Sequence, residues 1–247
     1  MREDKLQSAR YEFKYVVTED QARQIREYVL LHLEPDYFTA GKEGIGYAVH
    51  SLYLDGSSFQ TCFAVVQGQK NRFKLRLRFY DEEGPVFFEI KRRANLVILK
   101  QRASVKREHV QELLAGAPPD PDFLVQPDST KHFKALYTFC ELRDQIGAKP
   151  AAYTSYMREG YERTGDNAVR VTFDRELRAG AYKDKLTVAD IDEWDRPPME
   201  GVVLELKFTD RFPDWMLTLV QHFDLVRTGF AKYCKCVALV HDLGYDL

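Results

Sequence analysis

The chain has 247 residues and carries 36 Lys and Arg against 38 Asp and Glu, which gives a formal net charge of −2. This balance excludes a nonspecific nucleic-acid coat, which shows as a strongly basic domain, so no nucleic acid is expected among its partners. Hydrophobic residues make up 45% of the chain, enough for a substantial core. The charged amino terminus and the lack of a long apolar run predict a cytoplasmic protein with no transmembrane segment.

The first half of the chain predicts five strands and three helices. A capping-box pattern at Thr18 to Gln21 marks the start of the first helix, whose apolar residues follow helical spacing. A short helix is expected at 59–66 and a polar helix at 106–115. The strands are expected at 9–17, 47–55, 71–80, 85–93 and 96–104.

The second half predicts a helix around 133–140, strands at 151–163, 167–176 and 201–209, and helices after Pro213 and from 231 to 243. An acidic segment with prolines, 184–198, reads as a surface loop. Neither half has enough strands to close a sheet alone. We therefore expect a single domain over residues 1–247, of α+β class.

Most of these strands alternate charged and apolar residues with a period of two, which places one charged and one apolar face on each strand. A solvated sheet face gives the same alternation. However, a solvated face usually mixes charge signs and polar residues, whereas this one is mainly Lys and Arg. The expected inner residues are ten cations (Arg10, Lys14, Lys74, Arg76, Arg78, Lys91, Lys100, Arg102, Arg170, Lys207) and four carboxylates (Glu12, Glu89, Asp174, Glu205). Like charges on neighbouring strands repel, so such a face favours a polyanionic ligand.

Three of the carboxylates, Glu12, Glu89 and Glu205, stand two residues before a lysine on the same strand face. They could form ordinary ion pairs with those lysines. They could also hold Mg²⁺ or Mn²⁺, because hard divalent ions are bound by carboxylate and phosphate oxygens together. The sequence leaves both readings open.

Eight short motifs in order, spread over about residues 8 to 242, resemble the VTC domain of the triphosphate tunnel metalloenzyme superfamily. They are Arg10-Tyr-Glu-Phe-Lys-Tyr15, Ser51-Leu-Tyr-Leu-Asp55, Lys74-Leu-Arg-Leu-Arg78, Phe88-Glu-Ile-Lys91, Tyr156-Met-Arg158, Val169-Arg-Val-Thr-Phe-Asp174, Val203-Leu-Glu-Leu-Lys207 and Ala231-Lys-Tyr233. The resemblance implies an eight-stranded antiparallel closed β-barrel with flanking helices, which forms a tunnel for a triphosphate and a divalent metal.

The resemblance and the charged faces together assign three groups of residues. The catalytic candidates are Lys14, Arg76, Arg78, Lys91, Arg158 and Arg170. The substrate-binding candidates are Arg10, Lys74, Lys100, Arg102, Lys207 and Lys232, and the metal candidates are Glu205, Glu89 and Glu12. Glu205 is the main expected ligand of Mn²⁺ or Mg²⁺. Lys232 is expected to touch the phosphate chain near the tunnel mouth, helped there by Arg227 or Lys235, because Gly229 replaces a lysine of the family pattern.

The implied activity is that of a phosphotransferase that moves the terminal phosphate of ATP onto a polyphosphate chain. Two alternatives stay open: hydrolysis of inorganic or nucleoside triphosphates in the same tunnel, and binding of polyphosphate without catalysis. Arg10 stands where hydrolytic members of the superfamily carry a glutamate, which disfavours hydrolysis. The expected partners are ATP, triphosphate, polyphosphate and a membrane protein encoded separately.

Overall fold

The computed structural model describes residues 11–95, 97–165, 168–189, 191 and 193–244; Arg10 therefore lies outside the described residues. In these residues one antiparallel sheet has the strand order β1-β9-β8-β7-β3-β4-β5-β6, and the short β2 pairs with β7. The strands are β1 (Tyr11–Val17), β2 (Glu34–Pro35), β3 (Tyr47–Asp55), β4 (Asn71–Phe79), β5 (Val86–Ala94), β6 (Val97–Val105), β7 (Lys149–Glu162), β8 (Val169–Gly180) and β9 (Val202–Phe208).

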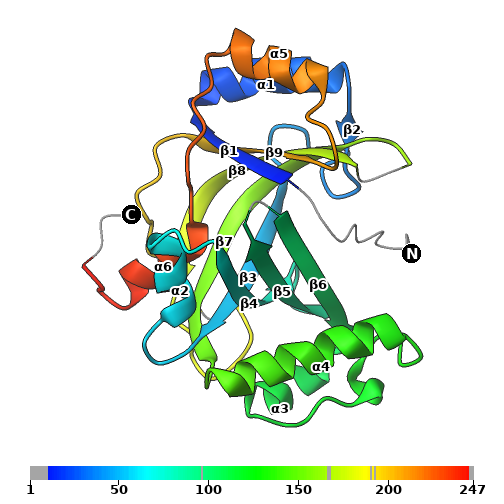
Figure 1. Cartoon of the computed structure of the whole chain (residues 1–247), viewed down its shortest axis with the longest axis vertical. Helices are drawn as coiled ribbons and strands as arrows, with labels where there is room; N and C mark the ends of the chain where they lie inside the picture. The colour runs from blue at the N-terminus through cyan, green and yellow to red at the C-terminus, as the bar shows by residue number, and fades with distance from the viewer. Residues whose placement is uncertain (1–10, 96, 166–167, 190, 192, 245–247) are drawn as a thin grey trace.

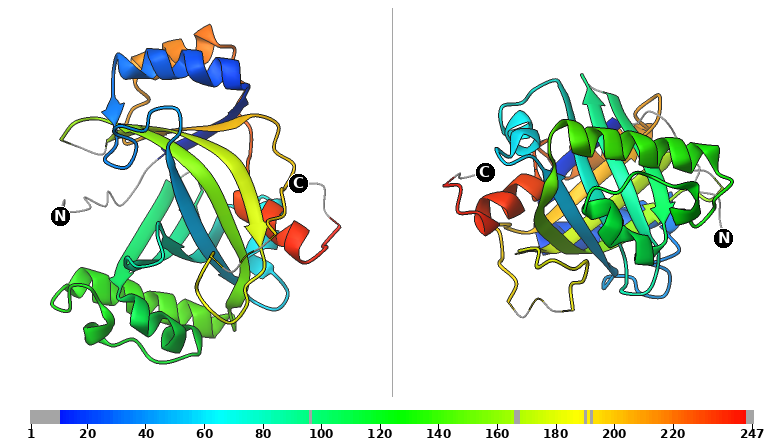
Figure 2. Two further views of the ribbon diagram at one scale, coloured as in Figure 1. Left: turned by 180° about the vertical axis from the view of Figure 1, so that it is seen from behind. Right: turned by 90° about the horizontal axis from the view of Figure 1, so that it is seen from below.

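Helices flank this sheet on several sides (Figures 1 and 2). Helices α1 and α5 lie over the β1-β9-β8 half, α3 and α4 cover the β4-β5-β6 half, and α2 lies beside α6 (Figure 1). The predicted α+β class with flanking helices is therefore confirmed. The helices are α1 (Glu19–Leu30), α2 (Gln60–Val66), α3 (Val110–Leu114), α4 (Thr130–Gln145), α5 (Asp214–His222) and α6 (Lys232–Val240), with 3₁₀ turns at Arg107–His109 and Pro121–Phe123.

Each of the eight predicted strands is present, with ends that differ from the prediction by no more than about four residues. The capping box at the start of α1 is also confirmed, because the Thr18 hydroxyl accepts from the Gln21 backbone and the Gln21 side chain accepts from the Thr18 backbone. The strand that the sequence missed is β2. It has two residues, too few for an alternating pattern to appear.

The sheet has an apolar outer face, which packs against the helices. On β4 and β5 this face consists of Leu75, Leu77, Phe88 and Ile90, each at most 2% exposed, and α3 and α4 cover it. A second apolar cluster joins α1 and α5 to β1, β8 and β9. Burying a side chain of this size contributes about 1.5–3 kcal/mol, so the outer face supplies much of the stability of the fold. The charged residues lie on the opposite face, called the inner face below.

The predicted closure of the sheet into a barrel is not observed. Edge strands β1 and β6 form no ladder with each other in the described residues, and each accepts a hydrogen bond from another segment at its free edge. The Thr228 backbone nitrogen donates to the Lys14 carbonyl on β1 at 2.9 Å. On β6, the Val125 nitrogen donates to the Ser104 carbonyl at 3.0 Å. Covered edges of this kind protect a sheet from pairing with other chains.

The turn before β3 contains a glycine that the packing requires. Gly46 has φ +72°, and a Cβ there would clash with the backbone oxygen of Arg158 on the neighbouring strand. Gly41 has a similar φ of +76° but open space around it. The two positions thus share the backbone strain and differ only in the clash.

We expect Gly46→Ala to lower the free energy of unfolding by about 2–5 kcal/mol, since left-handed strain of about 1–2 kcal/mol adds to overpacking of about 1–3 kcal/mol. Gly41→Ala should carry the strain alone. Denaturant unfolding of both variants measures the difference. Equal losses at the two positions would contradict the tight contact between the turn and β7.

Candidate functional site

The registers of β4, β5 and β6 align their cations in rows across the inner face. Lys74 lies opposite Lys91, and Lys91 lies opposite Lys100. Like charges directly opposite one another destabilise a sheet, so three lysines in one row carry a cost unless an anion lies near them. The row therefore concentrates positive charge in this half of the inner face.

The next row is built around one carboxylate. Glu89 is fully buried and lies opposite both Arg76 and Arg102. Its oxygens lie 2.7 Å from Arg76, 2.7 Å from Lys100 and 2.5 Å from Arg102. Burial would raise the pKa of Glu89, but these cations hold it well below its usual range. Glu89 is therefore a fixed negative charge shared by three cations.

A second carboxylate centre occupies the other half of the inner face. Glu205 on β9 lies 2.5 Å from Lys207 and 2.9 Å from Lys232 of α6. Lys14 and Arg158 approach it at 3.3 Å each. Burial would raise the pKa of Glu205, and the surrounding cations lower it well below its usual range. Four cations therefore share this carboxylate.

Asp174 on β8 adds a second negative charge beside Glu205. Arg158 donates to both of its oxygens, at 2.6 and 2.7 Å, and Lys232 lies 2.5 Å away. Burial would lower the pKa of Lys232, yet these carboxylates raise it well above its usual range. Lys232 is therefore a fixed cation that ties α6 to the sheet.

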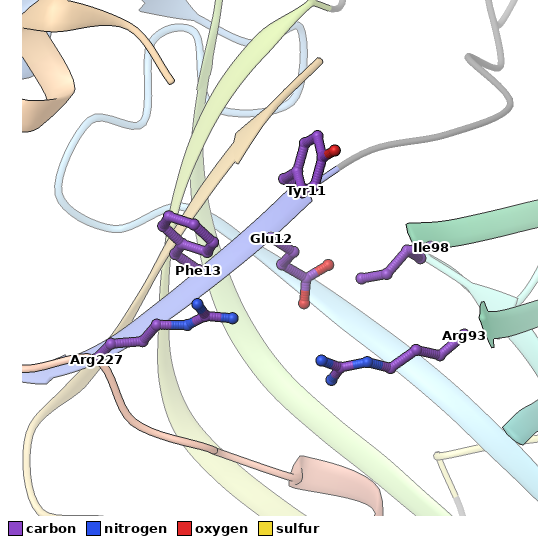
Figure 3. A pocket seen from close by; sticks show the side chains of 6 residues that line it. All are labelled: Tyr11, Glu12, Phe13, Arg93, Ile98 and Arg227. Carbon is purple, nitrogen blue, oxygen red and sulfur yellow. The ribbon is translucent and has the colours of Figure 1, made fainter. Parts of the chain in front are cut away.

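Glu12 on edge strand β1 connects the two halves. Its two oxygens lie 3.3 Å from Lys14 and 2.9 Å from Lys91, which stands on β5. Figure 3 shows Arg93 and Arg227 extending toward Glu12 across a cavity of about 140 Å³. The side chains of the two sheet edges thus meet although their backbones do not pair.

Two of the predicted cations have no carboxylate partner among the described residues. Arg78 is only 6% exposed, and its guanidinium donates to the hydroxyls of Tyr156 at 3.0 Å and Ser51 at 3.4 Å. Lys74 lies 5.3 Å from the centre of the Tyr233 ring, and burial lowers its pKa. These two side chains therefore rest on hydroxyl and ring contacts rather than on ion pairs.

A group of aromatic and acidic residues that sequence analysis did not assign to the site supports these cations. Asp55 accepts from backbone nitrogens at the start of α2. It also accepts from the Tyr233 hydroxyl at 2.6 Å. The Tyr233 ring stacks on Tyr53 at 4.3 Å, and the Tyr53 hydroxyl accepts from Arg76 at 3.1 Å. In the sequence, Ser51, Tyr53 and Asp55 stand two residues apart on one expected strand and so share a face, which is the signal that could have assigned them to the site.

The structure therefore brings most of the predicted residues together on one face. Arg170 is the exception, because its guanidinium turns away to bind Asp36 at 2.5 Å and Glu162 at 3.7 Å. Of the two residues predicted to help Lys232, Arg227 lines the cavity beside Glu12, and Lys235 lies over the Phe230 ring. In the inner-face set, Arg158 and Lys232 take the places of Arg10 and Arg170. The ten cations are then Lys14, Lys74, Arg76, Arg78, Lys91, Lys100, Arg102, Arg158, Lys207 and Lys232, and the four carboxylates are Glu12, Glu89, Asp174 and Glu205.

Comparison with known proteins identifies the family. Residues 9–241 match the sequence profile of the VTC domain. The chain belongs to the VTC domain family. Within the described residues, no helix of this VTC domain is both long and apolar enough to span a bilayer.

The relatives of this VTC domain are larger proteins. It is 24% identical to vacuolar transporter chaperone complex subunit 4 of Schizosaccharomyces pombe, over 94% of this chain and 37% of the relative. Subunit 2 of the same organism is 22% identical, over 93% and 37% of the two chains. The chain thus spans little more than a third of these curated relatives. A Bacillus halodurans protein provisionally assigned as an adenylate cyclase shares the fold, with a TM-score of 0.53, 11% identity and coverage of 91% and 96%.

Arg76 and Arg78 of β4 should respond differently to substitution. We expect Arg78→Ala to weaken triphosphate binding by about ten- to a hundredfold, since a charge-assisted contact contributes about 1.5–3 kcal/mol. Its melting temperature should fall less than that of Arg76→Ala, because in the described residues Arg78 loses hydrogen bonds to hydroxyls and no ion pair. Arg76→Ala removes a partner of buried Glu89 and should lower the melting temperature.

Calorimetric titration and thermal unfolding of the two VTC domain variants measure both effects. Unchanged triphosphate binding by Arg78→Ala would show that this arginine is a packing residue. An unfolded Arg78→Ala variant would lead to the same conclusion.

The shifted pKa of Lys207 predicts that the affinity for a polyanion depends on pH. Burial lowers the pKa of this lysine to about 7, although Glu205 opposes the shift. Its positive charge is therefore present below pH 7 and lost as the pH rises above 7. Affinity for a polyanion should fall over this range relative to Lys207→Arg, which stays charged.

Triphosphate titrations between pH 6 and 8.5 on both proteins test this expectation, and the arginine variant corrects for ionisation of the ligand. The ratio of the two dissociation constants should change by up to about tenfold. Parallel pH profiles would contradict the shifted pKa.

Proposed function

We propose that this VTC domain is a metal-dependent polyphosphate polymerase that transfers the terminal phosphate of ATP onto a polyphosphate chain. The observation that supports it is the inner face, where ten cations surround four carboxylates. A surplus of six positive charges is unfavourable on one face of a protein without an anionic ligand. A chain of phosphates supplies several negative charges in a row and would relieve this repulsion.

The spacing of the arginines on β4 suits such a chain. Arg76 and Arg78 are two residues apart on one strand face, about 6–7 Å along the strand. Arginine can donate two parallel hydrogen bonds to one phosphate group. With the lysine row beside them, these side chains would hold successive phosphates in line and stabilise the charge that develops during phosphoryl transfer.

The metal candidates differ in how well they suit a divalent ion. Both oxygens of Glu89 contact cations of its own half, which favours an ion-pair role. Glu12 and Glu205 both contact the Lys14 ammonium, so two carboxylates converge on one position now held by a positive charge. Such a pair fits Mg²⁺ or Mn²⁺, which one or two carboxylates bind together with phosphate oxygens.

The described residues include no group of three acidic, histidine or cysteine side chains arranged for a metal. The proposed ion would therefore depend on phosphate oxygens for part of its coordination. When bound, it would neutralise charge on those phosphates. Lys14, Lys207 and Lys232 would orient the phosphate oxygens around Glu205, and Arg158 would be held in place by Asp174.

We also propose a cytoplasmic site of action and a separately encoded membrane-protein partner. The two S. pombe relatives are named as subunits of one complex, which supports a role within an assembly. Co-purification of this chain with a membrane protein from its own cells would test this part of the proposal.

The main test is incubation with ATP and Mn²⁺, followed by gel separation of the products. Long-chain phosphate is the expected product. Orthophosphate alone would indicate hydrolysis, and unchanged ATP with bound polyphosphate would indicate a binding module. Either of these results would overturn the polymerase proposal.

We expect Glu205→Gln to abolish turnover while polyphosphate binding persists, because the substitution removes a metal ligand and raises the positive charge. Glu159→Gln is the matched control. Glu159 is equally buried, but it lies on the outer face, paired with Arg26 and Arg175. Both variants lose buried ion pairs, so similar losses of melting temperature are expected and only Glu205→Gln should be inactive. Full turnover by Glu205→Gln would contradict the metal assignment.

A further inference from the structure

A chain of aromatic rings connects the solvent to the inner face. Phe38, between β2 and β3, stacks on Tyr80 just after β4, with ring centres 5.1 Å apart and an interplanar angle of 17°. Tyr47 lies 5.1 Å from Phe38 and Phe87 lies 6.0 Å from Tyr80. These four rings, called the aromatic cluster, come from the loop before β3, from β3, from the residue after β4 and from β5. The tertiary fold therefore assembles them.

The inner end of the aromatic cluster contacts the cations of the phosphate site. The Arg102 guanidinium lies over the Phe87 ring at 4.5 Å. Burial would raise the pKa of the Tyr80 hydroxyl, but nearby Arg78 and Arg102 lower it. The Tyr80 hydroxyl thus lies in the field of the same arginine that has no carboxylate partner.

The outer end of the aromatic cluster is open to solvent. Phe38 is 44% exposed, and its neighbour Tyr37 is 83% exposed. Tyr47 is buried and its hydroxyl donates to Asp36, so packing explains an aromatic residue at that position. Packing does not explain the exposed rings of Phe38 and Tyr37. An exposed aromatic surface next to cationic side chains is the arrangement that proteins use to stack nucleobases while cations bind the phosphates.

We propose that Phe38 and Tyr80 form a stacking surface for the base of a nucleoside triphosphate whose phosphates contact Arg78 and Arg102. This inference rests on the proposed use of ATP and extends it, since it assigns a part of the protein to the nucleoside. Every nucleobase has an aromatic face, so the surface would bind purines by stacking area rather than by a hydrogen-bond code. Inorganic triphosphate would make no use of it.

The test compares two ligands, a non-hydrolysable ATP analogue and inorganic triphosphate, by calorimetric titration. Phe38→Ala should weaken binding of the analogue by about five- to a hundredfold and leave triphosphate binding unchanged. Phe38→Trp should retain or strengthen analogue binding, because it keeps a stacking face. Tyr137→Ala is the control, since Tyr137 is a similarly exposed aromatic residue, at 49%, on distant α4.

The outcomes separate this inference from the proposed function. If Phe38→Ala binds the analogue as tightly as the parent, or loses both ligands equally, the stacking surface is overturned while the phosphate site stands. If the parent binds triphosphate but no nucleotide, the stacking surface and the use of ATP both fail. If the parent binds neither ligand, the phosphate site itself fails.

Discussion

The sharing of a few buried carboxylates among many cations is the constraint on which the rest of this molecule depends. Glu89 forms ion pairs with three cations, and Glu205 forms ion pairs with four. Neither cluster is a set of matched pairs, so each half of the inner face keeps net positive charge. Isolated buried charges are costly, and the shared carboxylates reduce that cost without removing it. The inner face therefore keeps a positive electrostatic potential, which favours the binding of a polyanion.

The outer face supplies the stability that holds these charges together. Two apolar clusters fix α1 and α5 to one half of the sheet and α3 and α4 to the other. Helix α6 adds a different kind of contact, because Lys232 binds Glu205 and Asp174 while Tyr233 binds Asp55. A single short helix thereby links the acidic centre of one half to the basic row of the other. A bound polyanion would add to this stability by mass action.

The two edges of the sheet, β1 and β6, meet through side chains rather than through backbone pairing. Segments around Thr228 and Val125 occupy the backbones of β1 and β6, so side chains alone span the gap between them. Glu12, Arg93 and Arg227 line a cavity beside that gap, so charged side chains rather than backbone hydrogen bonds lie between the two edges.

Much of this was determined by the sequence by itself. The two-residue alternation of charge located most of the long strands and most residues of the inner face, because side chains of a strand must alternate between faces. The motifs also pointed to the VTC domain family, which the profile match bears out. The alternation could not say which carboxylate serves which cation, since that depends on the registers between strands far apart in the chain.

The tertiary structure alone decided the rest. In the described residues it left Arg78 without a carboxylate partner, paired Arg170 with Asp36, and placed other segments against the edges of β1 and β6. It also brought Phe38, Tyr80 and Phe87 together from segments that carry no common pattern. Local periodicity reports the face on which a side chain lies, whereas the partner it meets there is set by long-range packing.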